Sequence, residues 1–269
     1  MRLDGLNINF EYIKNKPVLN DINFSFSGGD FVAVLGTNGA GKSTLIKCLA
    51  SINKINSGEI KYNGENINKL NSKEKAKLIS YVPQSINFPD VSVYDAILIG
   101  RRPYINFEPK ESDYKMIDSV IHSFNLQNLA FKKANQISGG EKQKVAIARA
   151  IVQEPSVILF DEPTSSLDVN NQLDVLDLIS KITKENNLIS IMIIHDINLA
   201  LRFANKFMLM KGGKVLKLGN AEIINKENLD LTYNVNSKII NFDNNKIVIF
   251  NKKENIWRKT NLLNIFCLP

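Results

Sequence analysis

The feature that most constrains the fold of this 269-residue chain is a glycine-rich segment that directly follows a continuous apolar run. Residues 31–35 read FVAVL, and residues 36–44 read GTNGAGKST. The second segment fits the pattern G-x-x-x-x-G-K-[ST], in which a loop between a strand and a helix cradles phosphates. A run without polar residues is typical of a strand that is buried on both faces of a sheet. Together the two segments predict an α/β fold with a phosphate-binding loop.

Other segments predict the rest of the sheet structure. Residues 157–160 and 191–194 are again apolar, so we expect a central, mostly parallel sheet. Near the N-terminus apolar and polar residues alternate, which predicts antiparallel strands with one buried face. The apolar positions there are Leu6, Ile8, Phe10, Ile22, Phe24 and Phe26.

The chain is expected to form one large domain followed by a tail. Helical spacing dominates residues 85–154, which we interpret as a helical subdomain inserted between two strands of the sheet. The domain is expected to span residues 2–240 and the tail residues 241–269. Short strands are predicted at 239–242 and 247–250. The role of the tail, which contains Trp257, stays open.

The composition limits the possible partners. The 34 basic and 27 acidic residues leave a net charge of +7 at pH 7. Nucleic acid or an anionic membrane could account for this surplus, but no run of Lys or Arg exceeds two residues, so we favour a solvated surface. No apolar run approaches the roughly 20 residues that a membrane-spanning helix needs. Cys48, on the helix expected after the glycine-rich loop, is interpreted as a buried thiol.

The glycine-rich loop has the residues of an ATP site. Its glycines allow backbone N–H groups to face the phosphates, and the N-terminus of the following helix adds a favourable field. Lys42 is expected to reach the β- and γ-phosphates, and the Ser43 hydroxyl to bind Mg²⁺. The loop residues that we expect to bind ATP are Gly36, Thr37, Asn38, Gly39, Ala40, Gly41, Lys42, Ser43 and Thr44.

Two other predicted strands end in polar residues. Asp161 and Glu162 follow the apolar run 157–160, at the edge of the sheet where ligands bind in open α/β folds. Asp161 is expected to hold Mg²⁺. His195 follows the run 191–194, and Asp196 is a plausible N-cap for the next helix.

A second candidate anion site precedes residues 157–160. Ser138, Gly139, Gly140 and Glu141 open a good helix sequence, and a serine with two glycines at a helix start leaves backbone N–H groups free for an anion. The glycine-rich loop does not itself need a second site of this kind.

In this order, the segments resemble the ATP-binding cassette (ABC) family over roughly residues 2–240. The resemblance implies that Glu162 polarises the attacking water as general base and that His195 contacts the γ-phosphate. Gln84 would touch Mg²⁺ and water and couple to a membrane partner. Tyr12 would stack on adenine, with core packing as the alternative. Thr37 stands where the family usually has Pro, at a position that contributes backbone.

The resemblance also implies a shared active site. Ser138, Gly139, Gly140 and Glu141 would cap the γ-phosphate bound by a second copy of the chain, and a D-loop made of Ser166, Leu167 and Asp168 would cross the same interface. The expected assembly is therefore a homodimer that closes on two ATP molecules.

The class of cassette protein is indicated by residues 99–104, which read IGRRPY. They resemble a G-R-x-P-[HY] segment of cassettes that import iron(III)–siderophore, haem or cobalamin. The alternative is that Pro103 merely ends a helix and that Arg101 and Arg102 are solvated. We expect an ATPase at the cytoplasmic face of the membrane, bound to a separate permease through a groove lined by residues around 84–104 and served by an external substrate-binding protein. A zinc or manganese importer, an exporter's ATPase and a soluble cassette acting on ribosomes or DNA are the alternatives, and no nucleic acid is expected.

Overall fold

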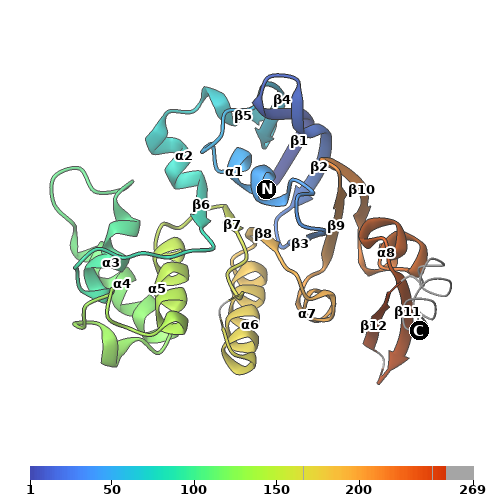
Figure 1. The fold of residues 1–269 in the computed structure, drawn as a ribbon. Coiled ribbons are helices and arrows are strands. Elements are labelled where there is room, and N and C mark those ends of the chain that lie inside the picture. The colour runs from blue at the N-terminus through green and yellow to red at the C-terminus, as the bar shows by residue number, and fades with distance from the viewer. Residues whose placement is uncertain (166, 244, 253–269) are drawn as a thin grey trace, which may run out of the picture.

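The computed structural model describes residues 1–165, 167–243 and 245–252. Its centre is a six-stranded sheet with the order β10-β9-β3-β8-β7-β6 (Figure 1). All pairs are parallel except β9 with β10. The strands are β3 (Phe31–Gly36), β6 (Ile79–Val82), β7 (Val157–Phe160), β8 (Ile189–Ile193), β9 (Lys206–Lys211) and β10 (Lys214–Gly219). Every residue of β3, β7 and β8 is buried, as the apolar runs predicted.

An antiparallel sheet with the order β2-β1-β4-β5 packs against one face of the central sheet. Its strands are β1 (Arg2–Ile13), β2 (Lys16–Ser27), β4 (Ser57–Tyr62) and β5 (Glu65–Asn66). The prediction that Leu6 shares the buried face of Ile8 is wrong, because Leu6 is 39% exposed. The pairing register with β2 shifts between Gly5 and Ile8, and Asn7 has a φ of 48°. A bulge at Asn7 therefore turns Leu6 away from the face that Ile8 occupies.

The two faces of β3 belong to two apolar cores. Val32 and Val34 pack with the antiparallel sheet and α1 (Lys42–Leu49), whereas Ala33 and Leu35 pack with the helices of the other face. Cys48 lies in the first core, where burial raises the pKa of its thiol to about 12. The predicted buried thiol is thereby confirmed.

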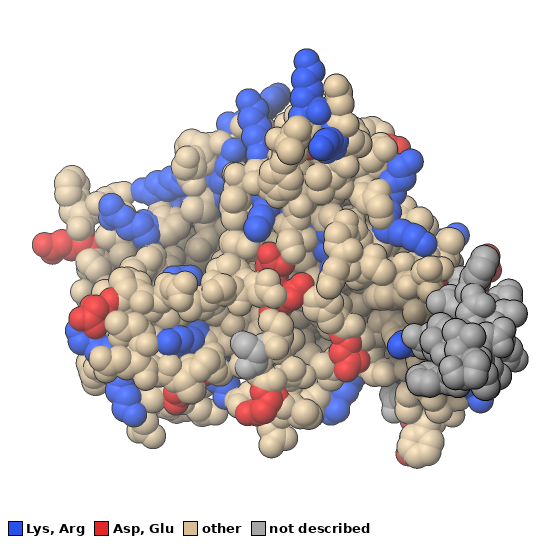
Figure 2. Space-filling model, in the orientation of Figure 1, with Lys and Arg blue, Asp and Glu red and all other residues tan. Residues whose placement is uncertain are grey.

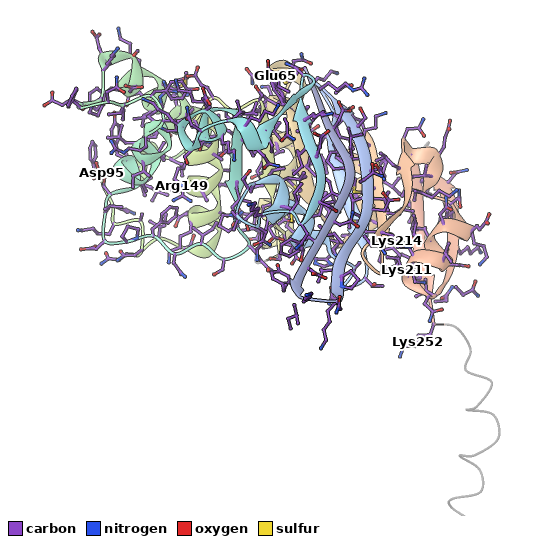
Figure 3. All side chains as sticks on the ribbon, turned by 90° about the horizontal axis from the view of Figure 1, so that it is seen from above. Glu65, Asp95, Arg149, Lys211, Lys214 and Lys252 are labelled. Carbon is purple, nitrogen blue, oxygen red and sulfur yellow. The ribbon has the colours of Figure 1, made fainter. Side chains whose placement is uncertain are left out.

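The expected helical subdomain leaves the sheet after β6 and returns to β7, its neighbour in the sheet. It lies at one end of the molecule, where Figure 3 labels Asp95 and Arg149. Its elements are α3 (Val93–Leu98), η2 (Ile99–Arg101), α4 (Glu111–Ser123), η3 (Gln127–Leu129) and α5 (Gly139–Ile151), and η1 (Ile67–Lys69) with α2 (Ser72–Leu78) precedes β6.

Residues 99–104 hold this subdomain together. Arg101 is 6% exposed and donates to Asp113 Oδ1 at 2.8 Å, to the Val152 carbonyl at 2.7 Å and to Glu154 at 2.5 Å. A Cβ on Gly100 would lie 2.2 Å from the Arg149 carbonyl oxygen, so only glycine fits against α5 there. The alternative that Arg101 is solvated is wrong, although Arg102 is exposed.

The last described elements form a small module beyond β10. It follows α6 (Val169–Glu185) and α7 (Ile197–Phe203) in sequence and consists of η4 (Ala221–Ile223), α8 (Lys226–Tyr233) and the antiparallel hairpin β11 (Asn236–Phe242) and β12 (Asn245–Asn251). Both strands were predicted, but the boundary expected between residues 240 and 241 falls within β11. Trp257 lies outside the described residues.

The surface charge is dispersed. On the face shown in Figure 2, Lys and Arg side chains are spread most densely over the upper part, and a few Asp and Glu side chains lie between them nearer the middle. In the part of the chain that the structure describes, no helix combines the length and the apolar character that crossing a membrane requires.

Candidate functional site

The glycine-rich loop connects β3 to α1 at the carboxyl edge of the central sheet. Gly36 and Gly41 have φ angles of 152° and 96°, which favour glycine. A Cβ on Gly36 would also lie 2.3 Å from the Met210 carbonyl oxygen of β9. The loop therefore has the compact form in which backbone N–H groups can surround a phosphate.

Lys42 is the first residue of α1 and is buried. Its Nζ donates to the carbonyl oxygens of Gly36 at 2.9 Å and Thr37 at 3.0 Å, so the ammonium group lies against the loop. Burial lowers the pKa of Lys42, while Glu162 and Asp161 act in the opposite direction by favouring its charged form. The loop thus carries a cation that faces two carboxylates.

Ser43 and Asp161 lie side by side. The Ser43 hydroxyl donates to Asp161 Oδ1 at 2.8 Å, and the Tyr81 hydroxyl donates to Oδ2 at 3.4 Å. Burial first, and then the Asp161 carboxylate, raise the pKa of Tyr81 to about 12. Hydroxyl and carboxylate oxygens are the ligands that Mg²⁺ prefers, so Ser43 and Asp161 fit that ion. A role for Tyr81 was not predicted. The available signal was its position as the last residue but one of β6, the strand beside β7.

Glu162 lies between His195 and Gln84. His195 Nε2 is 2.6 Å from Glu162 Oε1, and Gln84 Nε2 donates to Oε2 at 2.7 Å. The three residues follow the ends of β8, β7 and β6, which are adjacent parallel strands. Glu162 has a φ of 53°, a conformation that costs roughly 1–3 kcal/mol for a residue other than glycine and is concentrated at functional sites. The sequence predicted strand ends before Glu162 and His195 only, and the structure brings Gln84 to the same place after β6.

Tyr12 lies near the end of β1, beside the glycine-rich loop. Its hydroxyl is 3.4 Å from Thr44 Oγ1 and accepts from Asn53 Nδ2 at 3.1 Å, and its ring makes an edge contact with Phe10. Tyr12 is 61% exposed, so the core-packing alternative is wrong. An exposed aromatic ring next to the loop is free to stack on a planar ligand.

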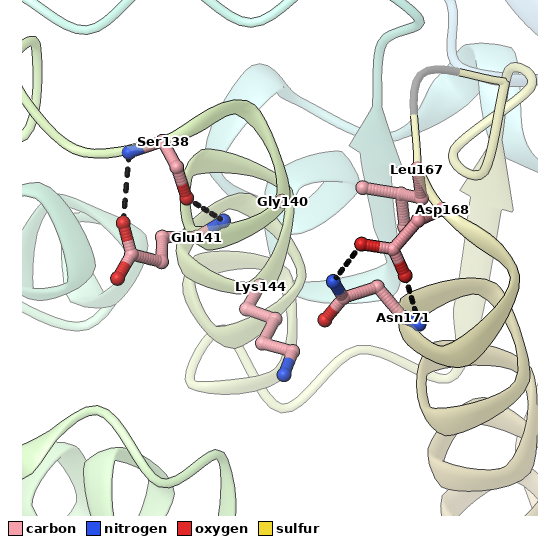
Figure 4. A pocket seen from close by; sticks show the side chains of 7 residues that line it. All are labelled: Ser138, Gly140, Glu141, Lys144, Leu167, Asp168 and Asn171. Carbon is pink, nitrogen blue, oxygen red and sulfur yellow. Dashed lines mark hydrogen bonds between the residues drawn. The ribbon is translucent and has the colours of Figure 1, made fainter.

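The segment 138–141 forms the start of α5. Ser138 Oγ accepts from Glu141 N at 3.3 Å, and Glu141 accepts from Ser138 N at 2.8 Å, which is a capping box (Figure 4). The N–H groups of Gly139 and Gly140 lie in the first turn, where a helix has no internal acceptors.

A pocket of about 410 Å³ opens beside this helix start. Leu167 and Asp168 line it from the other side, and Asp168 caps α6 by accepting from Asn171 at 2.9 Å (Figure 4). Ser166 lies outside the described residues. The pocket also contains Lys144 and Asn171, which were not predicted although each follows a predicted residue by three positions. None of the described residues of the glycine-rich loop lines this pocket.

These features agree with a sequence profile of the ABC transporter family, which matches residues 19–165. The chain belongs to the ABC transporter family. An uncharacterised ABC transporter ATP-binding protein of Methanocaldococcus jannaschii is 42% identical over 249 residues, covering 93% of this chain and 97% of the relative. A probable iron chelatin transport ATP-binding protein of Helicobacter pylori is 34% identical over 93% of this chain and 99% of its own. A phosphonates import ATP-binding protein of Lactococcus lactis is also 34% identical, and the match covers 84% of this chain and 96% of the relative.

Solved structures of ABC proteins are similar as well. A metal-chelate type ABC transporter in an inward-facing conformation has a TM-score of 0.78 at 32% identity, covering 93% of this chain and 96% of that chain. A dimeric ATP-binding cassette bound to ADP and phosphate has a TM-score of 0.72 at 28% identity. This match covers 81% of this chain and 98% of that chain. The predicted cassette fold is confirmed, and so is the resemblance to iron-chelate cassettes. This ABC chain is an ATP-hydrolysing cassette.

Proposed function

We propose that this ABC chain powers the import of an iron(III) chelate or cobalamin through a separate permease. The carboxylate of Glu162, held at both oxygens by His195 and Gln84, is the observation that supports hydrolysis most directly. Residues 99–104, the Helicobacter pylori relative and the metal-chelate type neighbour support the cargo class.

The residues of the site divide the work of phosphoryl transfer. Ser43 and Asp161 would hold Mg²⁺, which would neutralise part of the negative charge of the phosphates. Lys42 and the loop N–H groups would bind the β- and γ-phosphates, and Tyr12 would stack on adenine. Glu162 accepts the proton of the attacking water, while His195 and Gln84 fix the direction of its oxygens. Because two bonds hold this carboxylate beforehand, little reorganisation is needed at the moment of reaction.

A second copy of the chain would complete each site. The helix start at Ser138 and the D-loop residues Leu167 and Asp168 face a pocket that the glycine-rich loop of the same chain does not line. Free N–H groups at a helix start suit the γ-phosphate of ATP held by the other copy. The similar dimeric cassette supports a homodimer with two shared sites.

The helical subdomain would bind the permease at the cytoplasmic face of the membrane. Phe107 and Phe131 are 98% and 89% exposed, and the Phe131 ring stacks on Tyr94 at 6.5 Å between centroids. The stacked pair of Tyr94 and Phe131 would be the part of this surface that the permease covers. The external substrate-binding protein would contact the permease and not this chain.

Phosphonate import is the second candidate, because the Lactococcus lactis relative is as similar in sequence as the iron chelatin relative. The test is to purify the tagged chain from its native membrane and assay the co-purifying binding protein with ferric hydroxamate, haem, cobalamin and methylphosphonate. Binding of an iron chelate or cobalamin would support the proposal, and binding of the phosphonate alone would replace it. Ribosomes or DNA in the purified complex would discard transport.

A further inference from the structure

The C-terminal hairpin is joined to the helix that follows His195. The backbone N–H of Val248 in β12 donates to Asn198 Oδ1 at 2.8 Å, and Asn198 Nδ2 donates to the Val248 carbonyl at 3.2 Å. Asn198 lies in the first turn of α7, whose N-cap Asp196 accepts from Asn198 N at 2.7 Å. Because both hydrogen bonds of the Asn198 amide go to Val248, they fix the position of β12 relative to the start of α7.

The packing around this pair is apolar. Val248 is buried in the same core as Ile194 and Ile197. These two residues flank His195 and Asp196, the N-cap of α7. Among the described strands β11 and β12 pair only with each other, and a two-stranded hairpin has marginal stability by itself. The position of the hairpin therefore depends on the elements beneath it.

A second contact links the same hairpin, through Tyr233 of α8, to the glycine-rich loop. Tyr233, at the end of α8, is hydrogen-bonded to the backbone of Gly36, and its ring lies 5.3 Å from that of Phe250 in β12. Burial raises the pKa of Tyr233 to about 12, and the bond with Gly36 acts in the opposite direction. Figure 1 shows α8 and the hairpin together at the side of the molecule that carries β9, β10 and α7.

We propose that Asn198 is a positioning residue for hydrolysis, which acts by holding α7, and with it His195, at the correct distance from Glu162. The proposal depends on the role of His195 given above. α7 has seven residues, and a helix of this length owes its stability to tertiary contacts. His195 is 2.6 Å from Glu162, and a misplacement of about 1 Å in an active site can cost on the order of 100-fold in rate.

The experiment measures single-turnover ATP hydrolysis by the full-length chain. Asn198→Ala is expected to slow hydrolysis on the order of tenfold while the Kd for ATP stays unchanged. Asn198→Asp keeps the side-chain size and the bond from Val248 N–H but places an oxygen against the Val248 carbonyl, so it should also slow hydrolysis. The matched control is Asn205→Ala. Asn205 makes an equivalent pair of bonds with Phe31 N (2.9 Å) and Gly29 O (3.0 Å) beyond the other end of α7, and its loss should leave the rate unchanged.

A double-mutant cycle with His195→Ala separates positioning from simple loss of stability. If Asn198 acts through His195, Asn198→Ala should have no further effect once the histidine is gone. An equal rate loss in both backgrounds, a wild-type rate for Asn198→Ala, or the same rate loss for Asn205→Ala would overturn the positioning role. A wild-type rate for His195→Ala alone would instead reject the proposed function of His195, so the two failures are distinguishable.

Discussion

His195 Nε2 lies 2.6 Å from Glu162 Oε1. The two residues are 33 positions apart in the sequence but follow adjacent parallel strands, β7 and β8. Gln84, after the next strand β6, holds the other oxygen of the same carboxylate. The order of three strands thus holds the carboxylate of Glu162, which we propose as the general base, between residues that no local sequence pattern connects.

Replacing Glu162 with Gln should preserve ATP binding and abolish most turnover. The amide keeps the shape of the side chain but cannot accept a proton, so the rate should fall by at least about 100-fold. Phosphate release and gel filtration with ATP provide the measurement, with a stable closed dimer as the expected species. Phosphate release at the wild-type rate would exclude Glu162 as the base.

Replacing Ser138 with Ala should impair hydrolysis but leave ATP binding by the monomer intact. The lost cap of α5 should also lower the free energy of unfolding by about 1 kcal/mol. Asn225→Ala is the matched control, because Asn225 caps α8 by accepting from Asn228 N at 3.0 Å. Weaker ATP binding by the monomeric Ser138 variant would contradict a role in trans.

Replacing Tyr12 with Ala should weaken ATP binding on the order of tenfold, because stacking of a base on an aromatic ring is lost. Tyr12→Phe keeps the ring and removes only the hydroxyl contacts with Thr44 and Asn53, so its affinity should remain close to wild type. Fluorescence titration with a labelled ATP analogue measures both variants. Equal losses in the two would indicate that the hydroxyl, and not the ring, binds the nucleotide.

Replacing Asp113 with Asn should destabilise the helical subdomain in a pH-dependent way. Burial alone would raise the pKa of Asp113, but hydrogen bonds from the Lys110 backbone and Arg101 outweigh it and hold the pKa below its usual 3.8. The charged pair therefore stabilises the fold above pH 3.8, and this contribution is lost as the pH falls through the lower pKa of the folded state.

Urea unfolding at a series of pH values tests this prediction. At pH 7 the variant should be less stable by roughly 1.5–3 kcal/mol, and the difference should shrink below pH 3.8. Asp90→Asn breaks an exposed ion pair with Lys133 at 3.0 Å and should change stability by less than about 1 kcal/mol. A difference that stays constant with pH would show that the charge of Asp113 does not matter.

Much of the site could be predicted because it consists of strand ends. Buried parallel strands have a strong apolar signal, and the polar residue after each one has to lie at the carboxyl edge of the sheet. The exposed position of Leu6 could not be predicted, because the bulge at Asn7 depends on pairing with β2 and β4. The bonds of Asn198 with Val248 and of Tyr233 with Gly36 join distant segments, so they follow from tertiary packing alone.

If two copies of the chain share each ATP site, the glycine-rich loop of one copy lies against the start of α5 of the other. The most direct test mixes two differently tagged chains in the Glu162→Gln background, with Cys48 and Cys267 replaced. One chain carries Asn38→Cys in the glycine-rich loop, the other carries Gly140→Cys at the start of α5, and a short bifunctional maleimide is added with or without ATP. A shared site predicts a crosslink between the two tags that requires ATP. No crosslink between the tags, together with an internal crosslink when one chain carries both cysteines, would contradict it.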